Sequence, residues 1–343
     1  MNATHEHPVK AIWLRRLSKI TSYSTLFLIF VGSLVTSTGS GLSVPDWPLS
    51  YGTLTPPMVG GIRFEHSHRV VAALIGFLML CLTIVLARIE QRKWVRNLGF
   101  FALGAVILQG VLGGITVLFL LPKPVSITHG ILAQTFFVLT VIIAYSQSLE
   151  RKERLRKQTF LENETIIRML SAIFVLVFIQ LILGALMRHT HSGLAIPDFP
   201  KTGGMWWPTF DAKMLAAINA DRFFMNLDPA RLGQVVIHFT HRLWAGCIFV
   251  GIIFLTVTTL KAGKNNSRAY FAIMALDILV VVQMALGMMT VLSQKSVLIT
   301  SLHVVNGAAI LGWVSLTLLR LAPVSWSQFR HIFFRQNLNE NFF

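Results

Sequence analysis

Eight long stretches of the sequence are almost free of charged residues, and each is long enough to cross a bilayer as a helix. A hydrocarbon core of about 30 Å requires roughly 20 consecutive, mainly apolar residues. With 54% hydrophobic and only 13% charged residues, the chain departs strongly from soluble domains. We predict an all-α integral membrane protein. The expected spans are residues 22–39, 70–87, 98–120, 125–146, 167–186, 235–260, 269–292 and 297–319.

Basic residues indicate how these helices are oriented. Lys and Arg total 30 against 14 Asp and Glu, and they form five clusters that share one side if the helices alternate. The clusters lie before residue 22, at 88–96, 151–157 and 261–268, and at the C-terminus. Such loops mark the cytoplasmic side, so both termini are predicted to be cytoplasmic. The charge therefore reports topology and favours lipid, not nucleic acid, as a partner. Without an obvious transit peptide, a bacterial inner membrane is favoured.

The chain carries one pattern twice. Residues 40–48 read SGLSVPDWP, and residues 192–200, at an offset of 152, read SGLAIPDFP. A segment that begins at Gln109 recurs from Gln283, at an offset of 174. Four helices per copy is an even number, so we predict two tandem four-helix bundles related by a pseudo-twofold axis along the membrane normal. The predicted organisation is a cytoplasmic segment 1–21, a half 22–146, a cytoplasmic linker 147–166, a half 167–319 and a cytoplasmic tail 320–343.

Each half has two histidines near the predicted outer ends of its even-numbered helices. They are His68 and His129, 61 residues apart, and His241 and His303, 62 residues apart. A single intramembrane histidine is more often a hydrogen-bonded packing residue, but ionisable groups at this depth tend to be functional. Four equivalent positions favour ligands. Imidazole suits copper as well as iron, yet two rings at equal depth, without a thiolate or carboxylate cage, favour the two faces of a heme.

Three more charged residues accompany these histidines. Arg69 and Arg242 directly follow His68 and His241, and they suit either snorkelling to lipid phosphates or pairing with heme propionates. Glu65 lies three residues before His68, whereas its repeat partner is His238. An acid beside only one pair is expected if one half performs chemistry and the other stores or passes electrons. A helix N-terminal acid stabilised by the dipole is the alternative. His66 aligns with Phe239 and is not expected to be a ligand.

The outer loops differ more than the helices. Loop 189–234 has about 45 residues, twice its counterpart, and includes Trp206 and Trp207. A loop of this length caps a site or is partly disordered, and its tryptophans suit either interfacial anchoring or ligand contact. His189 and His191 are expected to be exposed. Cys81 and Cys247 lie at different helical depths, so we expect two small buried residues without a disulfide.

Taken together, these residues resemble heme A synthase over roughly residues 22–319. The motifs that carry the resemblance are Glu65-x-x-His68-Arg69, His241-Arg242, His129, His303 and the duplicated loop segment. The resemblance implies an oxidoreductase that oxidises the C8 methyl group of heme O to a formyl group, by successive hydroxylation, to give heme A for terminal cytochrome oxidase. It implies heme b between His241 and His303, substrate heme between His68 and His129, and Glu65 as the catalytic carboxylate.

The sequence departs from the pattern of the family in one respect, and one alternative function stays open. Many family members carry a cysteine pair in the first outer loop, but residues 42–63 contain none, so the electron donor is unidentified. Heme O synthase and the oxidase assembly machinery are the expected partners, and a homo-oligomer is compatible with the pattern. The rival is a diheme b-type cytochrome that transfers electrons from quinol, which leaves Glu65 and the long loop unexplained. A transporter is weaker, because the histidines lie near the outer surface.

Overall fold

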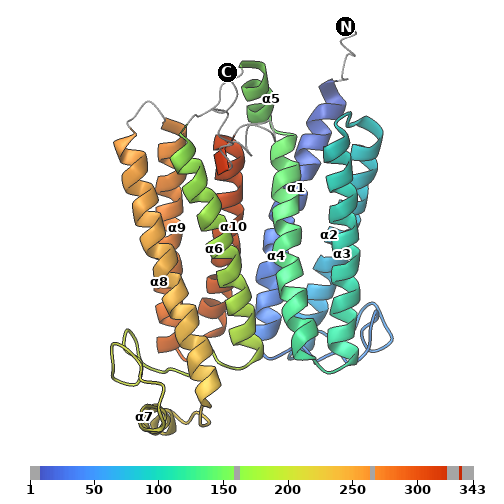
Figure 1. The fold of residues 1–343 in the computed structure, drawn as a ribbon. Helices are drawn as coiled ribbons and strands as arrows, with labels where there is room; N and C mark the ends of the chain where they lie inside the picture. The colour runs from blue at the N-terminus through green and yellow to red at the C-terminus, as the bar shows by residue number, and fades with distance from the viewer. Residues whose placement is uncertain (1–7, 158–162, 263–266, 323–331, 334–343) are drawn as a thin grey trace, which may run out of the picture.

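The computed structural model describes residues 8–157, 163–262, 267–322 and 332–333, and ten helices make up most of this part (Figure 1). Eight of them are long and apolar enough to cross a membrane, which confirms the predicted all-α membrane fold. The helices are α1 (Pro8–Ser37), α2 (Ile62–Ile89), α3 (Lys93–Leu118), α4 (Lys123–Ser146), α5 (Leu149–Lys157), α6 (Glu164–His189), α7 (Ala212–Phe224), α8 (Leu232–Lys261), α9 (Ser267–Leu292) and α10 (Val297–Leu321).

The spanning helices form two groups that stand side by side (Figure 1). Helices α1 to α4 pack in chain order, and α1 also contacts α4. Helices α6, α8, α9 and α10 repeat this arrangement, with α10 contacting α6. Contacts of α10 with α1 and α4, and of α4 with α6, join the two groups. The pseudo-twofold axis itself stays a prediction.

The two ends of the bundle differ in their connections. We call the end that carries residues 38–61, 119–122, 190–231 and 293–296 the loop face, and the opposite end, where α1 begins and α10 ends, the terminus face (Figure 1). All four predicted ligand histidines belong to helices whose first residues lie at the loop face.

Several helices begin earlier than the sequence predicts. Helix α1 starts at Pro8 instead of residue 22, and α2 starts at Ile62 instead of residue 70. Counting apolar residues measures the depth of the bilayer, whereas a helix continues through the charged turns beyond it. The predicted N-terminal segment and the first half thus share one continuous helix, and Glu65 lies in the first turn of α2.

Two short helices were not predicted. Helix α5 lies in the linker between the halves, and α7 lies in the long loop at the loop face (Figure 1). Helix α7 is capped by Asp211, whose carboxylate accepts a hydrogen bond from the Met214 amide. Its apolar side chains Met214 and Ile218 pack with Ile196. Helices of 9 and 13 residues are too short to be recognised by membrane-length hydropathy.

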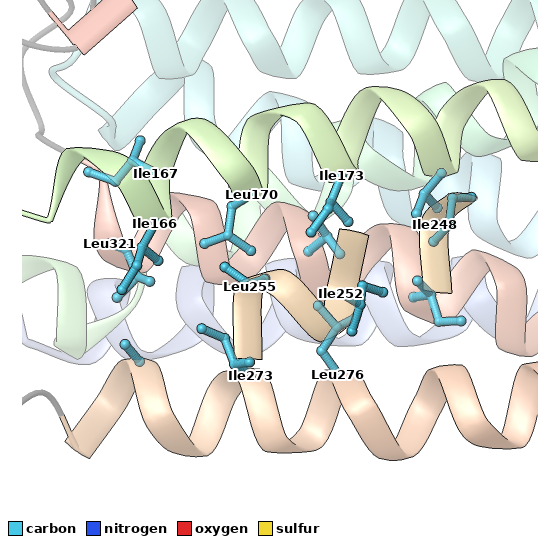
Figure 2. Close-up of a cluster of buried hydrophobic side chains, with 14 of the residues drawn as sticks. Ile166, Ile167, Leu170, Ile173, Ile248, Ile252, Leu255, Ile273, Leu276 and Leu321 are labelled. Carbon is cyan, nitrogen blue, oxygen red and sulfur yellow. The ribbon is translucent and has the colours of Figure 1, made fainter. Parts of the chain in front are cut away.

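The core of the second group is made of interlocking aliphatic side chains. Figure 2 shows Ile173 of α6, Ile252 of α8 and Leu276 of α9 directed toward one another. Lipid tails are as apolar as these side chains, so close van der Waals packing, not the hydrophobic effect, drives the association. The same rule acts between the groups, where Gly312 of α10 meets Phe137 of α4. A Cβ at Gly312 would come within 2.6 Å of the Phe137 ring.

At the terminus face, Glu90 ties the turn between α2 and α3 to the end of α4. Its carboxylate accepts hydrogen bonds from Arg92 Nη2 and from Gln147 Nε2, both at 2.7 Å. Burial alone raises the pKa of Glu90, but the hydrogen bonds from Arg92 and Gln147 outweigh it and hold the pKa at about 2.

We expect Glu90→Gln to lower thermal stability at pH 7 by on the order of 1 kcal/mol. Because folding depresses the pKa from 4.5 to about 2, the contribution is complete above pH 4.5 and is lost as the pH falls toward 2. Thermal denaturation of the wild type and the variant in detergent, at pH 7 and at about pH 2, measures the difference in stability. Glu164→Gln, in the exposed pair with Arg168, is the control and should change little. An equal effect of both variants, or no convergence with the wild type in acid, would contradict the assignment.

Candidate functional site

Each of the four predicted ligand histidines packs its ring against a glycine of a neighbouring helix. His68 lies against α1, His129 against α3, His241 against α6 and His303 against α9. A methyl group on each glycine would meet the histidine Cε1 atom closely. The separations are 2.9 Å for Gly32 and His68, 3.5 Å for Gly113 and His129, 3.4 Å for Gly184 and His241, and 3.1 Å for Gly287 and His303. The four glycines are related by the offsets 152 and 174. These histidine–glycine contacts, which we call glycine cradles, therefore belong to the repeat.

His68 and His129 belong to the first group of helices and His241 and His303 to the second, and the pairing of the rings within each group stays a prediction. Every one of the four Nδ1 atoms is buried without a hydrogen-bond partner. A buried ring nitrogen without a partner is costly unless another group, such as a metal centre, satisfies the site. Two buried imidazoles in each group thus have the donor chemistry of metal ligands, and their use as ligands stays a prediction.

The donor set also limits the kind of metal centre. Within the described residues, no group of three or more His, Cys, Asp or Glu side chains could hold a metal ion. A metal held by two imidazoles needs further ligands from elsewhere, and a porphyrin brings four of its own. The residues of both pairs thus fit a porphyrin iron with one imidazole on each face.

Glutamine side chains distinguish the two pairs. Gln180 Nε2 lies 3.3 Å from His241 Nε2 and donates to the His241 carbonyl at 3.0 Å. Gln283 Nε2 lies 3.4 Å from His303 Nε2. In the first group, Gln109 donates only to the His129 carbonyl, at 2.9 Å. The repeat places Leu28 opposite Gln180, so sequence comparison between the halves did not reveal this glutamine.

Glu65 and His238 occupy equivalent positions and lie against equivalent groups, a loop amide and the arginine four residues further on. Glu65 Oε2 accepts from the Val44 amide at 2.8 Å, and Oε1 accepts from Arg69 Nη2 at 2.6 Å. His238 Nδ1 lies 3.2 Å from the Ile196 amide nitrogen, and its Nε2 lies 3.2 Å from Arg242 Nε. Both side chains are buried. Both link the duplicated loop segment to its helix, but Glu65 accepts both bonds, whereas a neutral imidazole accepts only one.

Arg69 and Arg242 also bind the duplicated loop segments to their helices. Arg69 donates to the carbonyls of Val44, Asp46 and Leu49, so together with Glu65 it uses four of its five N–H groups. Arg242 donates to the carbonyls of Ile196 and Lys201, at positions equivalent to Val44 and Leu49. Pairing of either arginine with propionates stays a prediction, and in the structure both hold the loop.

The loop segment over each site is itself ordered by an aspartate. Asp46 accepts hydrogen bonds from the Gly52 amide at 2.8 Å and the Tyr51 amide at 2.7 Å, and these bonds lower the pKa of Asp46. Asp198 accepts from the Gly203 and Gly204 amides in the same way. Trp47 then closes over α3, where a Cβ at Gly114 would come within 2.7 Å of its ring. The loops are therefore preorganised lids at the histidine ends of the helices.

The other histidines and the cysteines considered in the sequence analysis lie outside the two candidate heme sites. His66 Nδ1 bonds to the Ser50 hydroxyl at 2.9 Å, consistent with a loop-fastening role. His191 is exposed as expected, whereas His189 is only partly exposed, because it ends α6 beside Arg188. Cys81 and Cys247 are free, but neither is fully buried as expected, because Cys81 is partly exposed on α2 and Cys247 is exposed on α8. Its helix face points away from the core of the second group.

The glycine cradles give a test of the first pair. We expect Gly32→Ala to displace the His68 ring, because the new methyl would lie 2.9 Å from Cε1, and to weaken binding of a porphyrin in the first group. Gly113→Ala is the matched control, since its contact with His129 at 3.5 Å is ordinary van der Waals contact. Titration of both variants with heme, followed by absorbance, measures the difference. Equal affinities in both variants would contradict the cradle.

Comparison with known proteins identifies the family of this chain. A model of COX15-CtaA, described as a cytochrome oxidase assembly protein, matches residues 62–315. The chain belongs to this family. The part matched to COX15-CtaA begins with the first residue of α2 and includes Glu65, all four histidines of the two pairs and both arginines.

Similar proteins cover most of the chain. A protein of Bacillus licheniformis named heme A synthase is 29% identical over 289 residues, which are 82% of this chain and 87% of that protein. Heme A synthases of Alkalihalophilus pseudofirmus and Geobacillus kaustophilus are each 26% identical, over 84% and 91% of this chain and 91% and 94% of those proteins. The COX15-CtaA membership and these relatives agree with the resemblance inferred from the motifs.

Proposed function

We propose that this chain is a heme A synthase, which oxidises the C8 methyl group of heme O to a formyl group for terminal cytochrome oxidase. The observation that carries the proposal is the asymmetry between two otherwise equivalent histidine pairs. A buried carboxylate, Glu65, stands beside the first pair, and the neutral side chain of His238 takes its place beside the second. The names of the similar proteins supply the reaction.

The two pairs have different roles in this proposal. His241 and His303 hold heme b as an electron relay, and Gln180 and Gln283 orient them from α6 and α9. His68 and His129 hold heme O, the substrate, in the first group. The iron porphyrins supply the redox chemistry when bound. The loop lids exclude water from the histidine ends of the helices, which keeps both sites in a medium of low dielectric constant.

Glu65 is the proposed catalytic residue of the first group. An ionised carboxylate is an acceptor only, and each Glu65 oxygen has a lone pair left after its bond to Val44 or Arg69. Glu65 can therefore accept a proton from water or from the oxidised methyl group at its free lone pairs, while Arg69 keeps the carboxylate in a single orientation. His238 is held by Ile196 and Arg242 in the same place and provides no negative charge.

A diheme b-type cytochrome is the rival, and the asymmetry disfavours it. An electron carrier has no need of a buried carboxylate beside one site, so the rival leaves Glu65 unexplained. We further propose a bacterial inner membrane with the terminus face in the cytoplasm, because the basic clusters gather at that face. Heme O synthase is the proposed supplier of substrate, and the electron donor acts without loop cysteines.

Expression with a supply of heme O, in a host that makes no heme A, tests the function. Chromatography of hemes extracted from the membranes should show heme A only when the chain is present. Unchanged heme O, with heme B bound at two per chain, would contradict the proposal and favour the electron carrier.

A further inference from the structure

A groove of about 730 Å³ opens on the side of the second group, between α8 and the loop segment over it. Phe199, Trp206 and Trp207 of the loop form its rim at the loop face. The groove then follows α8 past Leu243 and Val250 to Phe254. These three α8 side chains are 45%, 50% and 62% exposed. The groove therefore faces the bilayer, and it is separate from the glycine-backed side of His241.

The wall of the groove is one continuous face of α8. Its residues are Phe239, Arg242, Leu243, Gly246, Cys247, Val250, Gly251 and Phe254, which recur at the three- and four-residue spacing of a single helix face. From Arg242 to Phe254 this face is about 18 Å long, at 1.5 Å per residue. Such a length suits one extended acyl chain.

The internal repeat shows what makes the groove hollow. The positions of α2 that correspond to Gly246, Cys247, Val250 and Gly251 carry larger side chains, and these are Ala73, Leu74, Phe77 and Leu78. A Cβ at Gly246 would meet no atom within 4 Å, so the small residue is not required by close packing of helices. The second group therefore has less side-chain volume at this place than the first group.

Two cations stand at the loop-face end of the groove. The Lys201 ammonium lies over the Trp206 ring, 5.8 Å from its centroid, and the Arg242 guanidinium lies over Phe199 at 5.6 Å. Within the described residues, neither forms an ion pair with a carboxylate. Arg242 uses three of its five N–H groups on the loop and His238, which leaves donors for an anion.

We infer that this groove binds one anionic phospholipid of the leaflet at the loop face. The phosphate lies against Lys201 and Arg242, and one acyl chain lies along α8 from Leu243 to Phe254. Apolar chains gain little on leaving a bilayer for an apolar groove, so the charge at the mouth selects the occupant. The inference does not rest on the proposed function. Its consequence is structural, because the lipid fills the space between the long loop and the helix that carries His241.

Lipid counting by native mass spectrometry tests the site. The whole protein, stripped of lipid in detergent, is mixed with phosphatidylglycerol and phosphatidylcholine in equal amounts. We expect one phosphatidylglycerol to stay bound per chain. Lys201→Gln should lower the preference for phosphatidylglycerol over phosphatidylcholine about fivefold, from the loss of one surface cation. Gly246→Leu should abolish retention, because its side chain fills the groove.

The repeat supplies the matched control. Ala73→Leu makes the same kind of change on the exposed face of α2 and should retain the lipid. Val250→Phe, which installs the residue found at position 77, is a second blocking variant in case Gly246→Leu folds poorly. Equal retention of both lipids by the wild type, retention by both blocking variants, or recovery of an isoprenoid quinone in place of the phospholipid would overturn the inference.

Discussion

Replacing His241 or His303 with alanine is expected to strip heme b from the purified protein. Each ring supplies one axial ligand in the proposed site, and loss of a mere outer partner already weakens metal binding about 10- to 100-fold. We therefore expect the affinity for heme b to fall by more than about 100-fold, and the heme B content per chain, measured by chromatography of extracted hemes, to fall close to zero. His68→Ala and His129→Ala should leave heme b in place, because both residues lie in the first group of helices.

His66→Ala is the control for the loss of a histidine as such. Its ring bonds to Ser50 in the loop and takes no part in either pair. Full retention of heme b in His241→Ala and His303→Ala, or its equal loss from all four pair variants, would contradict the assignment of separate sites.

Replacing Glu65 with glutamine is expected to lower the rate of heme A formation by about 10²- to 10⁴-fold, the usual effect of removing a general base. The fold should survive, because an uncharged side chain, His238, holds the equivalent position in the second group. Glutamine keeps one acceptor oxygen for the Val44 amide. The variant should accumulate heme O or a hydroxylated intermediate, which chromatography of extracted hemes detects.

His238→Gln separates catalysis from fastening of the loop. It disturbs the equivalent fastener beside the other pair, so a loss of activity caused only by a loosened loop would appear in both variants. We expect His238→Gln to keep turnover within about tenfold of the wild type, below the range for a lost general base. Comparable losses in both variants would assign Glu65 a structural role.

Much of the fold could be predicted from the sequence, because a bilayer imposes a length and a composition on each spanning helix. The eight spans and the repeat follow from uncharged runs and from matched segments such as 40–48 and 192–200. The ends of the helices could not be predicted, since α1 and α2 extend well beyond the apolar depth. Helix α7 gives no signal of membrane length, and it is fixed by packing of Met214 and Ile218 on the loop.

The candidate site followed from the sequence only in part. The placement of all four histidines against glycines of neighbouring helices agrees with their equivalent positions in the repeat, and their pairing stays a prediction. The hydrogen bonds that hold the loop could not be predicted. Glu65 and Arg69 bind backbone amides and carbonyls of the loop, which every residue has, so no side-chain pattern in the sequence indicates them. The glycine cradles can be suspected from the sequence, because Gly32 and Gly184 recur at equivalent positions. That they contact histidine rings is seen only in the structure.

Identification of the hemes bound to the purified wild-type protein tests the central claim most directly. Extraction and chromatography should give heme B from the second group, together with heme O, a hydroxylated intermediate or heme A from the first. Heme B alone at two per chain would contradict a division of labour between the halves and would leave an electron carrier.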